Sequence, residues 1–174
     1  TGNTMTAEDV RFSFERLRNL KDNPAWLMDE VKSVEAVDGQ TGRITLTAPN
    51  AAFLSMLVSP NFAVVDSKAV KAKGGTDAAD AKTADKATEW LDQNSAGTGP
   101  FLYGGRQTGL NIVFKRNDKH WSGNKVDFEE LEFRIAREEA TRLALLLSGD
   151  VHIGDLPREL HKDALARGLK RFQS

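Results

Sequence analysis

The sequence predicts an α+β fold of mixed, mainly antiparallel strands with flanking helices. Three observations predict it. Apolar residues recur at helical spacing in several segments, short alternating segments occur in pairs, and Gly or Pro stands at the junctions between them. A chain of 174 residues with 40% hydrophobic and 28% charged residues has the composition of a globular protein and is long enough to bury a core.

Two helices are predicted near the N-terminus. Thr6 and Asp9 form a variant of the capping box, so a helix is expected to begin there. Its apolar face comprises Val10, Phe14 and Leu17. Pro24 predicts the start of a second helical segment. The apolar face of that segment comprises Leu27, Val31 and Val34.

A hairpin and two short elements follow. Residues 34–37 and 43–47 flank the turn-forming segment Asp-Gly-Gln-Thr-Gly, which predicts two paired strands. We expect a short helix over about residues 51–58, since Pro60 follows it. Residues 63–65 are apolar enough for a brief buried strand.

The middle of the chain changes in composition. Residues 68–86 are rich in Ala, Lys, Asp and Gly, which predicts a solvated connector with helical pieces. Helical patterning returns at 87–91. Residues 101–103 and 110–114 predict a half-buried antiparallel pair, and alternation over 131–136 predicts a third strand.

The last third alternates helices and short strands. Acidic residues in the first turn predict a helix over 138–147, and Gly149 is expected to end it. Residues 151–153 predict a short strand, and Pro157 the start of a final helix. A further strand is expected to start at 170–173.

Charge and composition exclude several classes of protein. A net charge of −1 argues against nucleic acid as a partner and against an anionic membrane surface. No segment is long and apolar enough to span a membrane. The chain has no cysteine, and its three histidines lack the spacing of metal ligands. We therefore expect neither a metal site nor a cofactor.

The motifs that carry catalysis are also missing from the sequence. Residues 97–99 begin like a dinucleotide fingerprint, but a strand is expected after them where that motif requires a helix. The glycine-rich segment 104–109 lacks the Gly-Lys-Ser/Thr of a phosphate loop and reads as a hairpin loop. Paired acids are adjacent in sequence, so they point to different faces. No catalytic residue is predicted.

The three tryptophans differ in their patterns. Trp90 and Trp121 are most simply core or anchor residues. Trp26 lies off the apolar stripe of its predicted helix, in the first turn after Pro24, so its indole is expected to be only partly covered. Core packing is the favoured interpretation for Trp26, and ligand stacking is the alternative hypothesis.

Several segments together resemble a known family. Residues 6–10 and 14–17 read Thr-Ala-Glu-Asp-Val and Phe-Glu-Arg-Leu, residues 43–46 read Arg-Ile-Thr-Leu, and residues 97–101 read Gly-Thr-Gly-Pro-Phe. In this order they resemble the extracytoplasmic solute-binding proteins of ABC importers. The resemblance is to the large family 5, which binds peptides, dipeptides and nickel chelates.

Later segments extend the resemblance to about residue 157, with two departures. Residues 148–151 read Ser-Gly-Asp-Val, as at the end of a family helix. Residues 116–121 resemble the family's Arg-Asn-Pro-x-Tyr-Trp, but Asp118 stands where Pro is common and His120 where Tyr is common.

The resemblance implies part of the N-terminal lobe of a two-lobed, periplasmic-binding-protein-like fold. Residues 1–67 would form a small subdomain, and residues 68–174 part of the main N-terminal lobe. Trp26 and Phe62 lie in segments that resemble those near the family's ligand cleft, so both are expected to face the ligand. Core packing is the alternative for each and the favoured one for Phe62.

The resemblance also implies partners and a location. The ligand would be a peptide or another small solute, and the protein partners would be the permease subunits of an ABC transporter. The protein would be periplasmic, or extracellular and anchored as a lipoprotein. Family members are much longer, and this sequence has neither an initiator Met nor a signal-peptide pattern, so we expect an internal piece.

Two other functions remain open from the residues alone. A hydrolase would assemble a catalytic site from distant segments, with a His in reach of a Ser and an acid. A standalone protein-interaction domain would expose a sizeable apolar patch.

Overall fold

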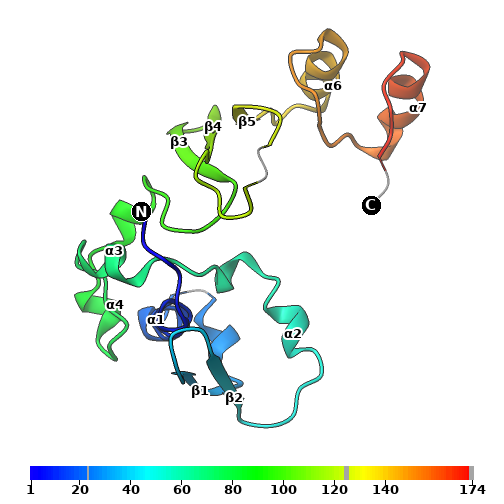
Figure 1. Cartoon of the computed structure of the whole chain (residues 1–174). Coiled ribbons are helices and arrows are strands. Elements are labelled where there is room, and N and C mark those ends of the chain that lie inside the picture. Colours follow the sequence, from blue (N-terminus) through cyan, green and yellow to red (C-terminus); the bar gives the residue numbers. More distant parts are fainter. Residues whose placement is uncertain (23, 124–125, 173–174) are drawn as a thin grey trace. The chain divides into compact units, whose positions relative to one another are not determined.

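Short helices alternate with two small sheets in the computed structural model, which describes residues 1–22, 24–123 and 126–172 (Figure 1). The helices are α1 (Ala7–Leu20), α2 (Phe53–Met56), α3 (Ser67–Lys71), α4 (Ala81–Ala84), α5 (Thr88–Leu91), α6 (Glu139–Ser148) and α7 (Arg158–Ala166), with 3-10 turns η1 (Ala25–Met28) and η2 (Pro60–Phe62). The strands are β1 (Val31–Ala36), β2 (Gly42–Leu46), β3 (Phe101–Gln107), β4 (Asn111–Arg116) and β5 (Glu130–Arg134). The predicted mixture of helices and antiparallel strands is confirmed.

The chain divides into two units. The first comprises Thr1–Tyr103 and Phe114–Glu130, and the second comprises Gly104–Val113 and Leu131–Ser174. The boundary expected between residues 67 and 68 falls inside the first unit, and that subdivision stays a prediction.

Helix α1 begins with the predicted capping box. The Thr6 backbone amide donates to Asp9 Oδ2 at 2.7 Å, and the Thr6 hydroxyl lies 3.0 Å from the same oxygen. Asp9 Oδ1 also accepts hydrogen bonds from the Ser67 amide and hydroxyl at 2.8 and 2.7 Å. Burial opposes ionisation of Asp9, but the hydrogen bonds from Ser67 and Thr6 outweigh it and hold its pKa below the ordinary value. One carboxylate therefore caps α1 and ties it to α3.

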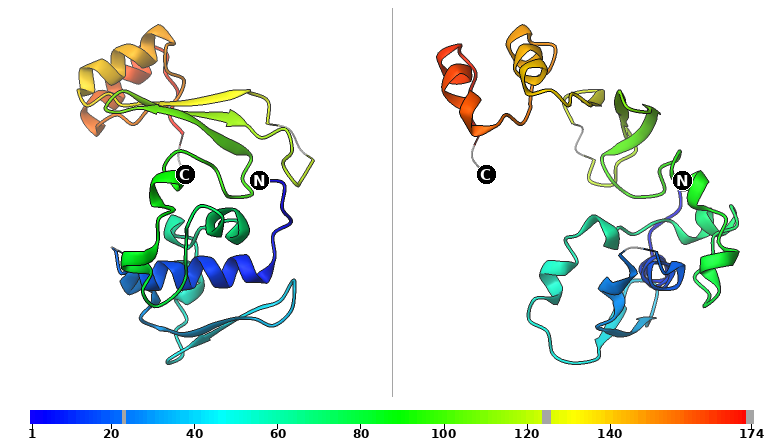
Figure 2. Two further views of the ribbon diagram at one scale, coloured as in Figure 1. Left: turned by 90° about the vertical axis from the view of Figure 1, so that its left-hand side faces the viewer. Right: turned by 180° about the vertical axis from the view of Figure 1, so that it is seen from behind.

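A first core forms on one side of α1. Its buried members are Phe14, Leu27, Met28, Val31, Val34, Phe53 and Phe62. The β1–β2 hairpin covers this core, with Val34 opposite Ile44 and Ala36 opposite Gly42. Figure 2 shows the hairpin running along one side of α1. The predicted hairpin is confirmed.

The predicted second helix is wrong beyond Met28. Instead of a helix through Val34, the chain makes the short turn η1 and then enters β1 at Val31. The register of β1 shifts between Val31 and Ser33, so Val31 and Val34 are both buried although they are three residues apart. A bulge breaks the alternation of side chains along a strand. The two buried valines therefore have the same spacing in sequence as residues on one face of a helix.

A second core lies on another side of α1. Its buried members are Phe12, Val70, Ala87 and Ala96, with Val65, Trp90 and Leu91 packed against them. Residues 63–65, predicted as a strand, have no regular secondary structure. Segment 68–86 contains the predicted helical pieces, but it also contributes Val70 to this core, and its Ala81 is fully buried as well.

Ion pairs attach the charged segment to α1. Arg16 Nε and Nη2 lie 2.8 Å from the two oxygens of Asp85, whose side chain is only 1% exposed. Arg11 Nη2 lies 2.6 Å from Asp77 Oδ2. Burial alone would raise the pKa of Asp85, but the Arg16 guanidinium and two backbone amides outweigh it and lower that pKa. The segment is therefore less solvated than its composition indicates.

The second sheet lacks the buried side chains that the β1–β2 hairpin contributes to the first core. Its strands follow the order β3-β4-β5, and none of their residues is buried. Gly149 ends α6 in the left-handed conformation at φ 80°, as predicted. Residues 151–153 form no strand, and neither do residues 170–172; Gln173 lies outside the described residues.

Candidate functional site

Trp26 lies on the 3-10 turn η1 and is exposed. Its side chain is 62% exposed, whereas the next two residues, Leu27 and Met28, are buried in the first core. The indole is partly covered, as expected, but the core packing favoured for Trp26 is wrong, because its side chain is absent from the first core. The turn therefore exposes an aromatic side chain, while its next two residues anchor the backbone in the first core.

Hydrogen bonds hold the chain that follows Trp26. The Asp29 amide donates to Trp26 O at 3.1 Å and closes the turn. The Thr47 amide donates to Glu30 O at 2.9 Å, and Arg18 Nη2 donates to Val31 O at 2.7 Å. The indole is thus carried by a turn with defined geometry.

Phe62 ends the 3-10 turn η2 and lies in the first core. It is 5% exposed, and its ring centroid lies 5.0 Å from that of Phe14. Ser59 caps this turn by accepting a hydrogen bond from the Asn61 amide. Trp26 and Phe62 therefore differ sharply in accessibility, and ligand contact by Phe62 stays a prediction.

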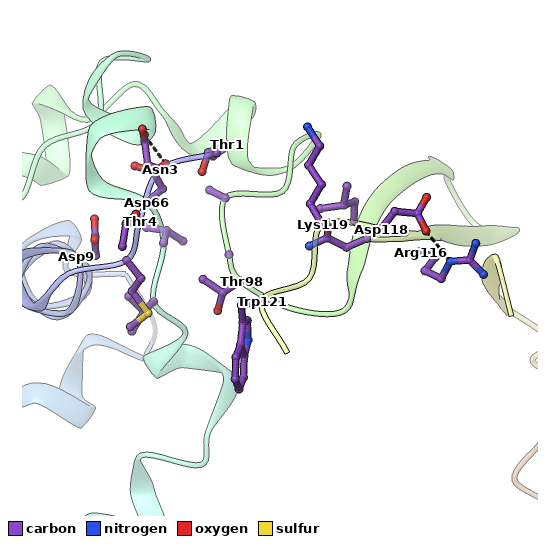
Figure 3. Close-up of a pocket in the computed structure, with 18 residues that line it drawn as sticks. Thr1, Asn3, Thr4, Asp9, Asp66, Thr98, Arg116, Asp118, Lys119 and Trp121 are labelled. Atoms are coloured by element: carbon purple, nitrogen blue, oxygen red, sulfur yellow. Dashed lines mark hydrogen bonds and ion pairs between the residues drawn. The ribbon is translucent and has the colours of Figure 1, made fainter. Parts of the chain in front are cut away.

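A cavity of about 1220 Å³ lies within the first unit. Its walls come from the N-terminal segment 1–5, residues 64–66, residues 96–98 and residues 116–119, and include the side chain of Trp121 (Figure 3). The indole of Trp121 is 78% exposed, so the prediction of a core or anchor role was wrong. The neighbouring Asn, Asp, Ser and Gly residues are typical of a loop and were the signal for exposure.

The protein's own donors occupy the carboxylates of this cavity. Asp66 accepts hydrogen bonds from Asn3 Nδ2 at 2.8 Å and from the Ala69 amide at 3.0 Å. Burial opposes ionisation of Asp66, but these bonds and one from Thr1 outweigh it and lower its pKa. Asp118 accepts from Arg116 Nε at 2.8 Å. These two acids therefore serve local structure.

One contact resembles part of a hydrolytic site. His120 Nδ1 lies 2.8 Å from Ser122 Oγ on the loop after β4, a pairing that the sequence reasoning did not identify. In a Ser-His-acid triad the serine faces Nε2 and the acid holds Nδ1, so the ring is used here in the opposite sense.

Within residues 1–22, 24–123 and 126–172, no group of three or more His, Asp or Glu side chains could hold a metal ion. In the same ranges, no helix has the length and apolar character needed to cross a bilayer.

Comparisons with known proteins identify relatives. The family model "Bacterial extracellular solute-binding proteins, family 5 Middle" matches residues 1–170. The probable D,D-dipeptide-binding periplasmic protein DdpA of Escherichia coli K12 is 34% identical over 154 residues, which cover 88% of this chain and 28% of DdpA.

Solved structures of binding proteins are also similar to this chain. The oligopeptide-binding protein AppA from Bacillus subtilis, in complex with a nonapeptide, superposes with a TM-score of 0.77 over 96% of this chain and 32% of AppA. Its identity is 19%, so this likeness concerns the fold. The periplasmic binding protein DppA from Helicobacter pylori, in complex with the peptide STSA, is 26% identical with a TM-score of 0.64, over 84% of this chain and 29% of DppA.

These likenesses agree with the expected α+β lobe of a periplasmic binding protein. The chain spans about three tenths of the length of the proteins it matches. Because the family model covers nearly all of it, the chain belongs to family 5 of the bacterial extracellular solute-binding proteins.

Proposed function

We propose that this chain is part of a longer solute-binding protein that captures peptides or similar small solutes outside the cytoplasm. The protein would deliver them to the permease subunits of an ABC importer. The family match over residues 1–170 is the observation that carries this proposal. Relatives named for dipeptide binding and a related structure with a bound peptide support the choice of ligand.

The mechanism would depend on binding rather than on a reaction. A ligand that contacts two lobes favours the closed form by its higher affinity for that form, and the importer would recognise it. The protein would act without catalysis. It would be periplasmic, or extracellular and anchored as a lipoprotein.

Trp26 is the proposed ligand contact on this chain. An exposed indole on an anchored turn offers a large apolar surface at low entropic cost, which suits the side chains and backbone planes of a peptide. Phe62 is the second proposed contact. Its burial indicates that it would act mainly by supporting the first core.

Calorimetric titration of the natural protein that carries this chain tests the proposal. Di-, tri- and oligopeptides are compared with non-peptide solutes, and we expect saturable binding of at least one peptide class. The 174-residue chain alone is expected to show no measurable affinity, because the opposite lobe would supply most contacts. Absence of peptide binding by the natural protein would contradict the proposal.

The hydrolase alternative rests on one observation, the contact between His120 and Ser122, although that contact uses Nδ1 rather than the Nε2 that a triad uses. Incubation with peptide and ester substrates tests it, with product detection by mass spectrometry. We expect every substrate to be recovered intact. Product formation that a Ser122→Ala variant abolishes would establish the alternative.

A further inference from the structure

Arg18 reaches from α1 to the strand that follows the Trp26 turn. Its Nη2 donates to Val31 O at 2.7 Å, across 13 residues of sequence. The carbonyl belongs to the first residue of β1, where the register of the hairpin shifts. A bulge disrupts the regular ladder of backbone hydrogen bonds, so a side-chain donor at this position stabilises an irregular piece of backbone.

The guanidinium is itself held in place. Arg18 Nη1 lies 3.3 Å from Glu15 Oε2 one turn earlier on α1, and the two side chains are 30% and 17% exposed. Glu15 therefore orients the donor, and the hydrogen bond to Val31 O is charge-assisted and partly buried.

A residue next to β2 also binds the backbone that follows the Trp26 turn. Glu30 O accepts from the Thr47 amide at 2.9 Å, so two consecutive carbonyls are bound by different elements. Leu27 and Met28 anchor the turn in the first core. Packing therefore anchors the turn that carries Trp26, and donors from two elements hold the backbone that follows this turn.

We propose that Arg18 is a positioning residue for ligand capture, acting through Trp26. This inference rests on the proposed function, because it assumes that the Trp26 indole meets the ligand. A contact surface that is ordered before binding avoids the entropic cost of ordering it during binding. Removing the Arg18 donor should therefore loosen the turn and weaken ligand binding, while the core beneath it remains.

The helix offers a matched control. Arg11 also makes charge-assisted contacts from α1, but its partners are Glu8 and Asp77, on the side of the second core. Arg18→Met and Arg11→Met both keep an apolar stem and remove a guanidinium. Only the first change removes a donor next to the Trp26 turn.

The experiment uses the natural protein labelled with 5-fluorotryptophan. The Trp26 signal is assigned in the fluorine NMR spectrum by a Trp26→Phe variant. We expect Arg18→Met to shift and broaden this signal and to raise the peptide dissociation constant about tenfold. Arg11→Met should leave both unchanged, and Arg18→Lys should restore part of each.

Each outcome decides between explanations. An unchanged Trp26 signal together with an unchanged dissociation constant in folded Arg18→Met overturns the role of Arg18. If the parent protein binds no peptide, the proposed function fails, while the fluorine signal still tests the positioning of the turn. Should Arg18→Met not fold, Glu15→Gln releases the guanidinium without removing it, and a Trp26 signal unaffected by that change overturns the inference as well.

Discussion

Helix α1 separates two cores that are held together in different ways. The first core, around Phe14, consists mainly of large apolar side chains. The second core, around Phe12, combines small residues such as Ala87 and Ala96 with an adjacent ion pair between Arg16 and Asp85. Hydrophobic pattern predicts the first kind of core well. The second depends on partners that lie far apart in the sequence.

The first core should be the more sensitive to loss of volume. Phe62→Ala removes a buried ring that packs against Phe14, and we expect a loss of about 4 kcal/mol in the free energy of unfolding. Urea unfolding followed by circular dichroism measures it. Phe62→Leu, which keeps most of the volume, should cost much less. Equal losses in the two variants would contradict the packing explanation.

The second core should be the more sensitive to loss of a charge. Asp85→Ala leaves the Arg16 guanidinium, largely covered by protein, without its carboxylate, and we expect a loss of about 3 kcal/mol. Glu35→Ala is the control, because its pair with Arg43 is exposed and should contribute at most about 0.5 kcal/mol. Equal losses of unfolding free energy in the two variants would show that the pair between Asp85 and Arg16 contributes no more than an exposed ion pair.

Close packing against a glycine distinguishes the second core from the exposed turn of the β1–β2 hairpin. A Cβ atom on Gly75 would lie 2.4 Å from Val70 Cγ1 and 2.9 Å from Val70 O, so we expect Gly75→Ala to cost about 2 kcal/mol. Gly39 has no such neighbour within 4 Å, and Gly39→Ala should be nearly neutral. Thermal unfolding of both variants checks this. A neutral Gly75→Ala would mean that the loop relaxes without cost.

Acid should weaken the contacts made by buried carboxylates. Asp85 and Asp9 both have pKa values below the ordinary value, so their contribution is present above about pH 4, the unfolded range, and is lost as the pH falls through the folded values. The free energy of unfolding should fall on acidification below that range. Asp85→Asn should flatten the dependence, and an equally steep profile in this variant would remove Asp85 from the explanation.

Local signals in the sequence predicted much of the fold. The capping box at Thr6, the β1–β2 hairpin and the left-handed Gly149 each depend on residues close in sequence, and all three are confirmed. The sequence did not reveal the bulge after Val31, because the buried residues Val31 and Val34 are three positions apart, as on the face of a helix. The partner of Asp85 was equally hidden, because Arg16 lies 69 residues away.

The candidate site was predictable only in part. Trp26 stood out because it broke the apolar stripe, but its pattern still favoured core packing, which its exposure contradicts. Arg18 carried no signal, because its acceptor is a backbone carbonyl and any residue type can supply one. Long-range contacts to the backbone leave no trace in a single sequence.

The most direct measurement compares two exposed tryptophans in peptide titrations of the natural protein. Trp26 and Trp121 are both accessible, but only Trp26 lies on the proposed ligand contact. We predict that Trp26→Ala raises the peptide dissociation constant roughly thirtyfold, or about 2 kcal/mol, and that Trp121→Ala leaves it within about twofold. Unchanged affinity in Trp26→Ala, with a large loss in Trp121→Ala, would contradict the account and move the binding site to the cavity.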